Sequence, residues 1–142
     1  MSFANHVRVF ICVVLMGLLC GYVLNAENDV TDNAYIHAVK DGKLNEYREV
    51  VIKDAFNIYF GNAYWRYYEA KTGEHVVELS GRASYKGEKG DTILQFVIND
   101  AATEIRIAGL KFNGIVQDKN DKWQLIENVY ANWHEQSNIS RK

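Results

Sequence analysis

The longest uncharged run of the chain lies near its start and differs from everything that follows. Residues 9–26, VFICVVLMGLLCGYVLNA, carry no charged side chain, and they are preceded by Arg8 and followed by Glu27. The apolar core 9–24 would form a helix about 24 Å long at about 1.5 Å per residue. That length is slightly short of a hydrocarbon core of about 30 Å. We therefore expect either an uncleaved transmembrane anchor or a signal peptide that is cut after Ala26.

Both alternatives place the rest of the chain outside the cytoplasm. A basic residue on the short leading side and acidic residues on the trailing side favour a cytoplasmic N-terminus. The predicted organisation is a cytoplasmic segment 1–8, the anchor or signal peptide 9–26, a polar spacer 27–32 and an extracytoplasmic domain 33–142.

The only two cysteines, Cys12 and Cys20, both lie in the apolar run. They are eight residues apart on one helix and cannot bridge each other, so the outer domain is expected to lack disulfides. This absence favours the bacterial envelope over an animal extracellular module. We predict a single-pass protein of the bacterial inner membrane with its C-terminal domain in the periplasm, or a protein secreted to the periplasm if the N-terminal segment is cleaved.

Three segments of the outer domain repeat apolar residues at the helical spacing of three and four. The first follows a cap at Thr31 or Asp32, has Ala34, His37 and Ala38 as its stripe, and ends before Gly42. The second covers about 52–60, and Gly61 with Asn62 supplies a left-handed termination. The third covers about 120–134 after a cap at Asn120 or Asp121, and its tail is expected to fray. Its stripe is the clearest in the chain and consists of Trp123, Ile126, Tyr130 and Trp133.

Between the last two helices the spacing changes to two, which is typical of half-solvated strands. In the second of these strands Val77 and Leu79 point inward, while Glu78 shares the solvated side. In the third, Leu94, Phe96 and Ile98 point inward. In the fourth the inward parity switches at Ala108 and Gly109, which predicts a β-bulge. We expect an α+β fold in which helices, including a C-terminal one, pack on a four-stranded antiparallel meander. The predicted strands are 64–70, 76–85, 92–99 and 104–113, and turns are predicted at 71–74, 86–91 and 100–103.

Several stretches of the outer domain resemble one family. These are VKDGKLNEY (39–47), VIKDAFNIYFGNAYWRYYEAKTGEHVVELSGRASY (51–85), LQFVIN (94–99), LKFNGIVQ (110–117) and LIENVY (125–130). They are similar to a small extracytoplasmic α+β domain of bacterial membrane-anchored proteins, which follows a transmembrane helix and sometimes a cytoplasmic zinc ribbon. This chain departs from the family because eight residues ahead of the anchor cannot supply a zinc ribbon. The family has no agreed activity, so the resemblance implies placement and fold and carries over no catalytic residue.

Composition narrows the possible functions. The chain has 16 Lys+Arg and 18 Asp+Glu, a net charge of -2, and therefore no general cationic field for a nucleic-acid backbone. We expect no binding to nucleic acid. A hydrophobic content of 48% fits one folded domain rather than a disordered chain.

No catalytic motif appears: HExxH, CxxC, GxSxG and a phosphate loop are all missing from the sequence. Three histidines of the outer domain have structural explanations. We expect His37 to be half-buried in the first helix, His75 to be a solvated residue beside a turn, and His134 to lie favourably at the negative end of the last helix. Acidic residues do not follow the spacing of a calcium loop. We therefore predict a non-catalytic protein without a metal or cofactor.

Five consecutive residues, Tyr64, Trp65, Arg66, Tyr67 and Tyr68, form the candidate site. Alternation along a strand sends Trp65 and Tyr67 to one face and Tyr64 and Tyr68 to the other. One pair is then partly exposed, unless helices cover both faces. Exposed aromatic residues beside an arginine are typical of protein contact surfaces.

Two functions fit these features. The first is an interaction module, of an inhibitor, immunity, exclusion or envelope-assembly type, that binds another envelope or membrane protein through the five residues. The alternative is a periplasmic binding module for a small envelope ligand such as a glycan or lipid, with a cavity lined by Phe56, Phe96 and Trp123.

Overall fold

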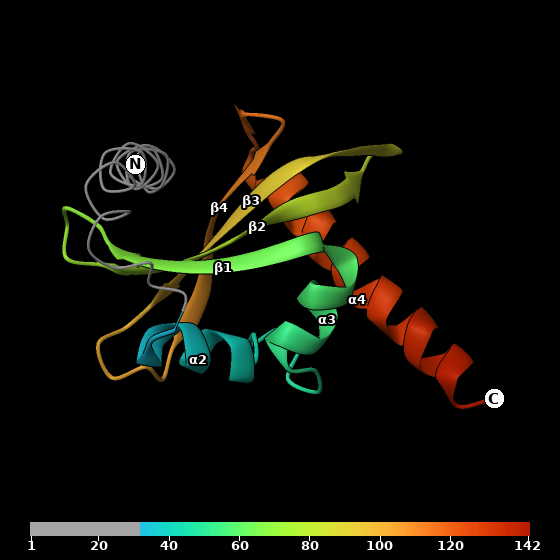
Figure 1. Cartoon of the computed structure of the whole chain (residues 1–142), viewed down its shortest axis with the longest axis horizontal. Coiled ribbons are helices and arrows are strands. Elements are labelled where there is room, and N and C mark those ends of the chain that lie inside the picture. Colours follow the sequence, from blue (N-terminus) through green and yellow to red (C-terminus); the bar gives the residue numbers. More distant parts are fainter. Residues whose placement is uncertain (1–31) are drawn as a thin grey trace.

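The computed structural model describes residues 32–142, so the segments predicted for 1–8, for 9–26 and for most of the spacer lie outside the described residues. No helix within 32–142 has both the length and the apolar character needed to cross a bilayer. The elements in chain order are α2 (Ala34–Asp41), α3 (Ile52–Tyr59), β1 (Gly61–Glu69), β2 (His75–Tyr85), β3 (Glu88–Ile98), β4 (Ile105–Phe112), β5 (Ile115–Val116) and α4 (Lys119–Ser140) (Figure 1).

The strands form one antiparallel sheet in the order β1-β2-β3-β4-β5. The α+β class, the meander and the C-terminal helix are confirmed, whereas the expected number of four strands is wrong. Asn113 and Gly114 both have positive φ angles, 49° and 80°, as a tight two-residue hairpin turn requires. The turn folds β5 back onto Lys111 and Phe112. A two-residue strand is too short to show an alternating pattern, so the sequence analysis missed it.

The β2–β3 turn is also tighter than expected. Lys86 and Gly87 alone form it, with φ angles of 51° and 77°, and Ser84 already pairs with Lys89. Residues 88–91, which we assigned to the turn, therefore extend β3.

The bulge predicted at Ala108 and Gly109 is confirmed. Gln95 pairs with Gly109, but the next residue, Phe96, pairs with Ile107. Ala108 is the extra residue, and its insertion lets Ile107 and Leu110 face the same core although their sequence parity differs.

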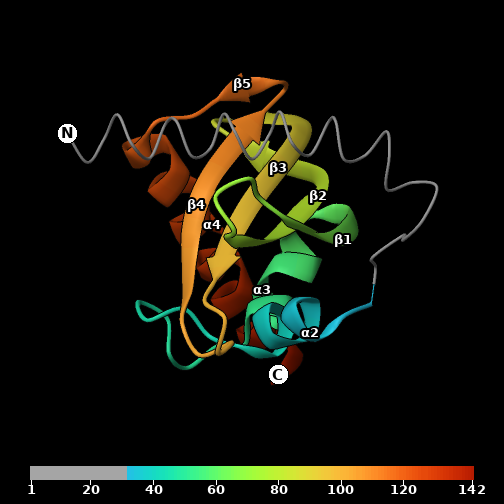
Figure 2. The ribbon, with the colours of Figure 1, turned by 90° about the vertical axis from the view of Figure 1, so that its left-hand side faces the viewer.

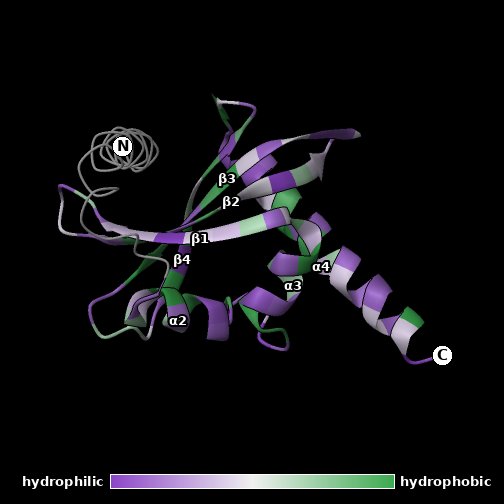
Figure 3. Cartoon of the chain, viewed as in Figure 1, coloured by the Kyte–Doolittle hydropathy of each residue, from purple (hydrophilic) through white to green (hydrophobic). Residues whose placement is uncertain are grey.

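The three helices described here pack on the same face of the sheet (Figures 1 and 2). Hydrophobic and hydrophilic residues alternate along β2 and β3, as the colours of Figure 3 show. Their inward side chains meet the buried residues of α3 and α4. The core contains, among others, Val77, Leu79, Leu94, Phe96, Ile98, Ile52, Phe56, Leu125, Ile126 and Val129.

The cap and the buried stripe of α2 differ from the prediction. Asn33, rather than Thr31 or Asp32, caps the helix, because its side-chain oxygen accepts a hydrogen bond from the backbone N–H of Ile36 at 2.8 Å. Ile36 and Val39 are its buried residues. His37, expected to be half-buried, is exposed and contacts Asp32.

The C-terminal helix begins earlier and ends later than expected. Asp118 is its cap and accepts a hydrogen bond from the Asp121 N–H at 2.8 Å. No Gly or Pro lies between Lys119 and Ser140, so the helix continues to Ser140. His134 therefore lies within the helix rather than at its end. The tail that we expected to fray is helical.

The buried stripe of α4 is centred on Leu125, Ile126, Val129 and Tyr130, with Trp123 and Trp133 only half-buried beside it. Tyr47, from the connection between α2 and α3, stacks on Tyr130 with ring centroids 3.8 Å apart. This contact packs the irregular connection between α2 and α3 against α4. The sequence pattern predicts no helix or strand in that connection.

Gly81 is required where β2 passes the start of β1. A Cβ atom on Gly81 would lie 2.7 Å from the carbonyl oxygen of Gly61, and a backbone atom cannot move aside without distorting the strand pair. We expect Gly81→Ala to lower the free energy of unfolding by about 1–3 kcal/mol, measured by urea denaturation. Ser84→Ala, at an exposed position of the same strand, should change it by less than about 0.5 kcal/mol. An equal effect of both substitutions would contradict this explanation.

Candidate interaction surface

Pairing with β2 decides where the aromatic residues of β1 point. Trp65 pairs with Leu79 and Tyr67 pairs with Val77, and both partners belong to the core beneath the helices. Trp65 and Tyr67 therefore face the helices. By alternation, Tyr64, Arg66 and Tyr68 lie on the opposite side of the sheet, which we call the second face.

The five residues do not form one exposed patch. Trp65 is buried, its indole N–H donates to Asn57 Oδ1 at 2.8 Å, and its ring stacks on Phe96. Tyr67 is half-buried and Tyr68 is buried. Only Tyr64, 44% exposed, and the Arg66 side chain, 32% exposed, present substantial surface. The expectation of one exposed aromatic pair therefore holds only for Tyr64.

The strand register places one row of side chains across the whole second face. Tyr64 on β1 pairs with Ser80 on β2, and the row continues through Ile93, Lys111 and Val116 on the next three strands. Both ends of this row, Tyr64 and Val116, are exposed. The row therefore joins an aromatic residue at one sheet edge to an aliphatic residue at the other.

The next row contains a polar cluster centred on Glu78. Its side chain was expected to be solvated, but Glu78 is only 7% exposed. Arg66 Nη2 donates to Glu78 Oε1 at 2.7 Å, and the Tyr68 hydroxyl donates to Glu78 Oε2 at 2.9 Å. Gln95 Nε2 donates to the same Oε2 at 3.2 Å and to the Tyr68 hydroxyl oxygen at 2.8 Å. The carboxylate is thus buried with hydrogen bonds to both of its oxygens.

Two further features describe this cluster. Burial, together with the nearby Glu78 carboxylate, raises the pKa of Tyr68 far above its usual value, so Tyr68 remains a hydrogen-bond donor. The buried Gln95 Oε1 has no hydrogen-bond partner among the described residues. Sequence alternation directed Gln95 to the solvated side of β3, and nothing in the local pattern indicated its burial.

A small apolar cluster adjoins the polar one on the second face. Tyr68, Ala70, Val76 and Val97 are buried together, with Ala108 of the bulge packed against them. The second face therefore combines a buried centre with charged and aromatic side chains around it.

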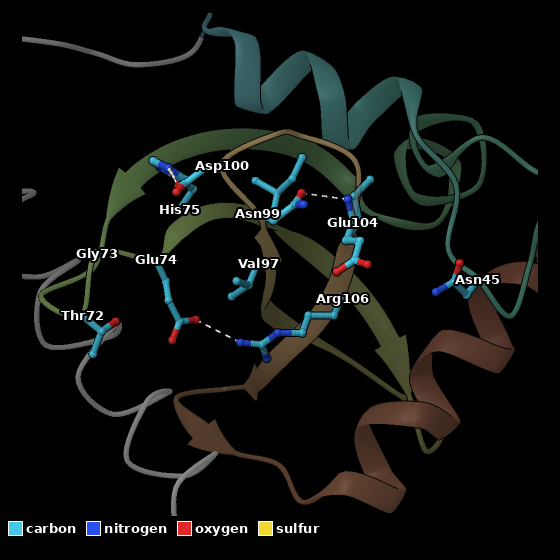
Figure 4. A pocket seen from close by; sticks show the side chains of 12 residues that line it. Asn45, Thr72, Gly73, Glu74, His75, Val97, Asn99, Asp100, Glu104 and Arg106 are labelled. Carbon is cyan, nitrogen blue, oxygen red and sulfur yellow. Dashed lines mark hydrogen bonds and ion pairs between the residues drawn. The ribbon is translucent and has the colours of Figure 1, made fainter.

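A cleft of about 500 Å³ lies between the β1–β2 turn and the β3–β4 turn (Figure 4). Both signs of charge line it. Arg106 Nη2 lies 3.0 Å from Glu74 Oε2 on one side, and His75 Nε2 lies 2.7 Å from Asp100 Oδ1 on the other. The turns that the sequence predicted at 71–74 and 100–103 thus frame the cleft.

His75 is not the solvated residue that the sequence suggested. Its side chain is only 14% exposed and stacks on the Tyr35 ring with centroids 4.0 Å apart. Its Nδ1 is 2.8 Å from the Tyr67 hydroxyl, while its Nε2 contacts Asp100. The imidazole therefore ties α2, β1 and the β3–β4 turn together.

Asp100, His75 and Tyr67 contact one another in series. A carboxylate, an imidazole and a hydroxyl in this spatial order are the groups used to activate a nucleophile. The two ends of this arrangement differ in their surroundings. Asp100 is 92% exposed at the tip of a turn, whereas burial raises the pKa of the Tyr67 phenol, with smaller contributions from nearby Glu69, Tyr35 and Asp100. Burial therefore favours the protonated form of the phenol, and the contacts link β1, β2 and the β3–β4 turn.

The ligand cavity that we expected between Phe56, Phe96 and Trp123 does not coincide with a cleft described here. Phe56 and Phe96 are fully buried and contact each other edge to face, with ring centroids 5.5 Å apart. None of the three lines the 500 Å³ cleft or the smaller one, of about 310 Å³, beside residues 45–50. Within residues 32–142 no group of three His, Cys, Asp or Glu side chains gathers as a metal site would require.

Comparison with known proteins identifies no relative: no family model, no curated protein and no solved structure matches this chain.

Proposed function

We propose that the chain is a membrane-anchored extracytoplasmic interaction module that binds another envelope or membrane protein through the second face of its sheet. One observation carries the proposal. The helices of the described chain all pack on one face, while the other presents Tyr64, Arg66, Arg82 and Val116 around a buried centre. Tyrosine and arginine are the residue types that contribute most to protein interfaces.

In this proposal residues 9–26 hold the domain at the outer side of a bacterial inner membrane, or direct it to the periplasm if they are cleaved. The module works by contact, without a cofactor and without nucleic acid. Inhibition, immunity, exclusion and assembly of an envelope complex are roles that require only such a contact.

A second candidate function is binding of a small envelope ligand, such as a glycan or a lipid headgroup. The observation that favours it is the 500 Å³ cleft, whose volume lies within the usual range for ligand sites. Arg106 would donate hydrogen bonds to such a ligand, and the carboxylates of Glu74 and Asp100 would accept them.

Photo-crosslinking in cells tests the proposed surface. A photoreactive amino acid replaces Tyr64 or Val116 in the full-length protein, and a matched variant carries it in place of Ile58. Ile58 is similarly exposed but lies on α3, on the helix side of the sheet. We expect positions 64 and 116 to yield an adduct of the same mass, at least fivefold more abundant than any adduct from position 58. Equal yields at all three positions, or no adduct from 64 and 116, would contradict the proposal.

A further inference from the structure

We propose that the partner docks on the second face through an acidic segment whose carboxylates bind Arg66 and Arg82. This inference rests on the proposed function and names the chemistry of the partner. The strand register brings several charged side chains to this face.

Basic residues outnumber acidic ones on the second face. The acidic ones are Glu78, which is buried, Asp91, and Glu74 of the adjoining turn, which contacts Arg106 at 3.0 Å, whereas the chain as a whole has a net charge of -2. The second face is thus positively charged on a negatively charged protein, and complementary charge favours an acidic partner. By strand pairing, its basic residues are Arg66, Arg82, Lys89, Arg106 and Lys111.

Arg66 is held in place before any partner arrives. Its Nη2 contacts Glu78 at 2.7 Å, and its guanidinium carbon lies 5.3 Å from the centroid of the Tyr68 ring. A guanidinium has five N–H groups in a planar fork, so the contact with Glu78 leaves donors for a second carboxylate. Because the side chain is already ordered, binding costs less conformational entropy than binding to a mobile arginine.

Arg82 supplies the second positive position. Its Nη1 lies 3.1 Å from Asp91 Oδ1, in a pair whose side chains are 51% and 80% exposed. An ion pair so exposed is worth little, about 0–1 kcal/mol, so a partner's carboxylate can compete for this guanidinium.

The spacing of the two arginines fits an extended segment. Arg66 pairs with Glu78, and Arg82 lies four residues further along β2, which is about 13 Å at about 3.3 Å per residue. An extended partner segment places the side chains of residues i and i+4 on one side at the same separation. Carboxylates at those two positions would reach both arginines at once.

The test measures how a change of charge affects the crosslink from position 116. We expect Arg82→Glu to reduce the adduct at least fivefold, whereas Arg82→Lys retains at least half of it. Arg48→Glu is the matched control, because Arg48 is an exposed basic residue in the connection between α2 and α3, away from the strands. It should leave the adduct unchanged. Thermal unfolding of each variant must show that the fold is retained.

Sequencing of the crosslinked peptide gives the second readout. We expect Asp or Glu residues spaced by four around the linked position. An adduct that persists in Arg82→Glu, or a linked peptide without acidic residues, would overturn the acidic-partner inference while the proposed surface stands. Loss of the adduct from the parent protein at positions 64 and 116 would instead overturn the proposed function.

Discussion

Glu78→Ala is expected to lower the free energy of unfolding by about 3 kcal/mol, at the low end of the range for breaking a buried ion pair because Arg66 is partly solvated. The substitution removes the acceptor of three hydrogen bonds, which come from Arg66, Tyr68 and Gln95. The Tyr68 hydroxyl and the Gln95 amide would then remain buried without the carboxylate that accepts their hydrogen bonds. Urea denaturation at neutral pH measures the loss.

Asp91→Ala provides a matched control on the same face. Asp91 also pairs with an arginine, Arg82, at 3.1 Å, but both side chains of that ion pair are solvated. We expect a change of less than about 1 kcal/mol. If both substitutions lowered the free energy of unfolding equally, burial would not explain how much the polar cluster around Glu78 contributes to stability.

Raising the pH above 10 is expected to unfold the protein. Tyr68 and Tyr130 are buried, and burial is the largest cause that raises the pKa of both phenols above the usual value. The unfolded chain ionises its tyrosines near pH 10, while the folded chain keeps these two protonated. Their contribution to stability is therefore complete below about pH 10 and is lost as the pH rises, by about 1.4 kcal/mol per pH unit for each phenol.

Two variants separate this effect from other alkaline changes. The buried Tyr130 hydroxyl has no hydrogen-bond partner among the described residues, so Tyr130→Phe should preserve stability at pH 7 and reduce its decline with pH by about 1.4 kcal/mol per unit above 10. Tyr64→Phe, at an exposed position, should not change the decline. Urea denaturation from pH 8 to 12 measures all three proteins, and an unchanged decline in Tyr130→Phe would contradict the explanation.

Local patterns predicted the strands well because alternation is a property of neighbouring residues. The inward positions Leu79, Leu94 and Phe96 and the bulge at Ala108 follow from parity alone. Helix ends were less accurate: Asn33 caps α2 in place of the expected Thr31 or Asp32, and Asp118 caps α4 in place of the expected Asn120 or Asp121.

The polar contacts depend on distant parts of the chain. His75 contacts Asp100, 25 residues away, and Glu78 contacts Gln95, 17 residues away. Alternation identified the side of the strand for Glu78 and Gln95 but treated that side as solvated. It could not show that Tyr68, Val76 and Val97 would bury the centre of this face.

The sequence by itself determines the alternation that produces an antiparallel meander, the apolar stripe of α3, and the separation of Trp65 and Tyr67 from Tyr64 and Tyr68. The tertiary structure alone decides that Glu78 is buried, that His75 contacts Tyr67 and Asp100, and that the exposed charges of the second face are mainly basic. The reason is physical: periodicity is encoded by residues a few positions apart, whereas burial and charge pairing arise where register brings separate strands together.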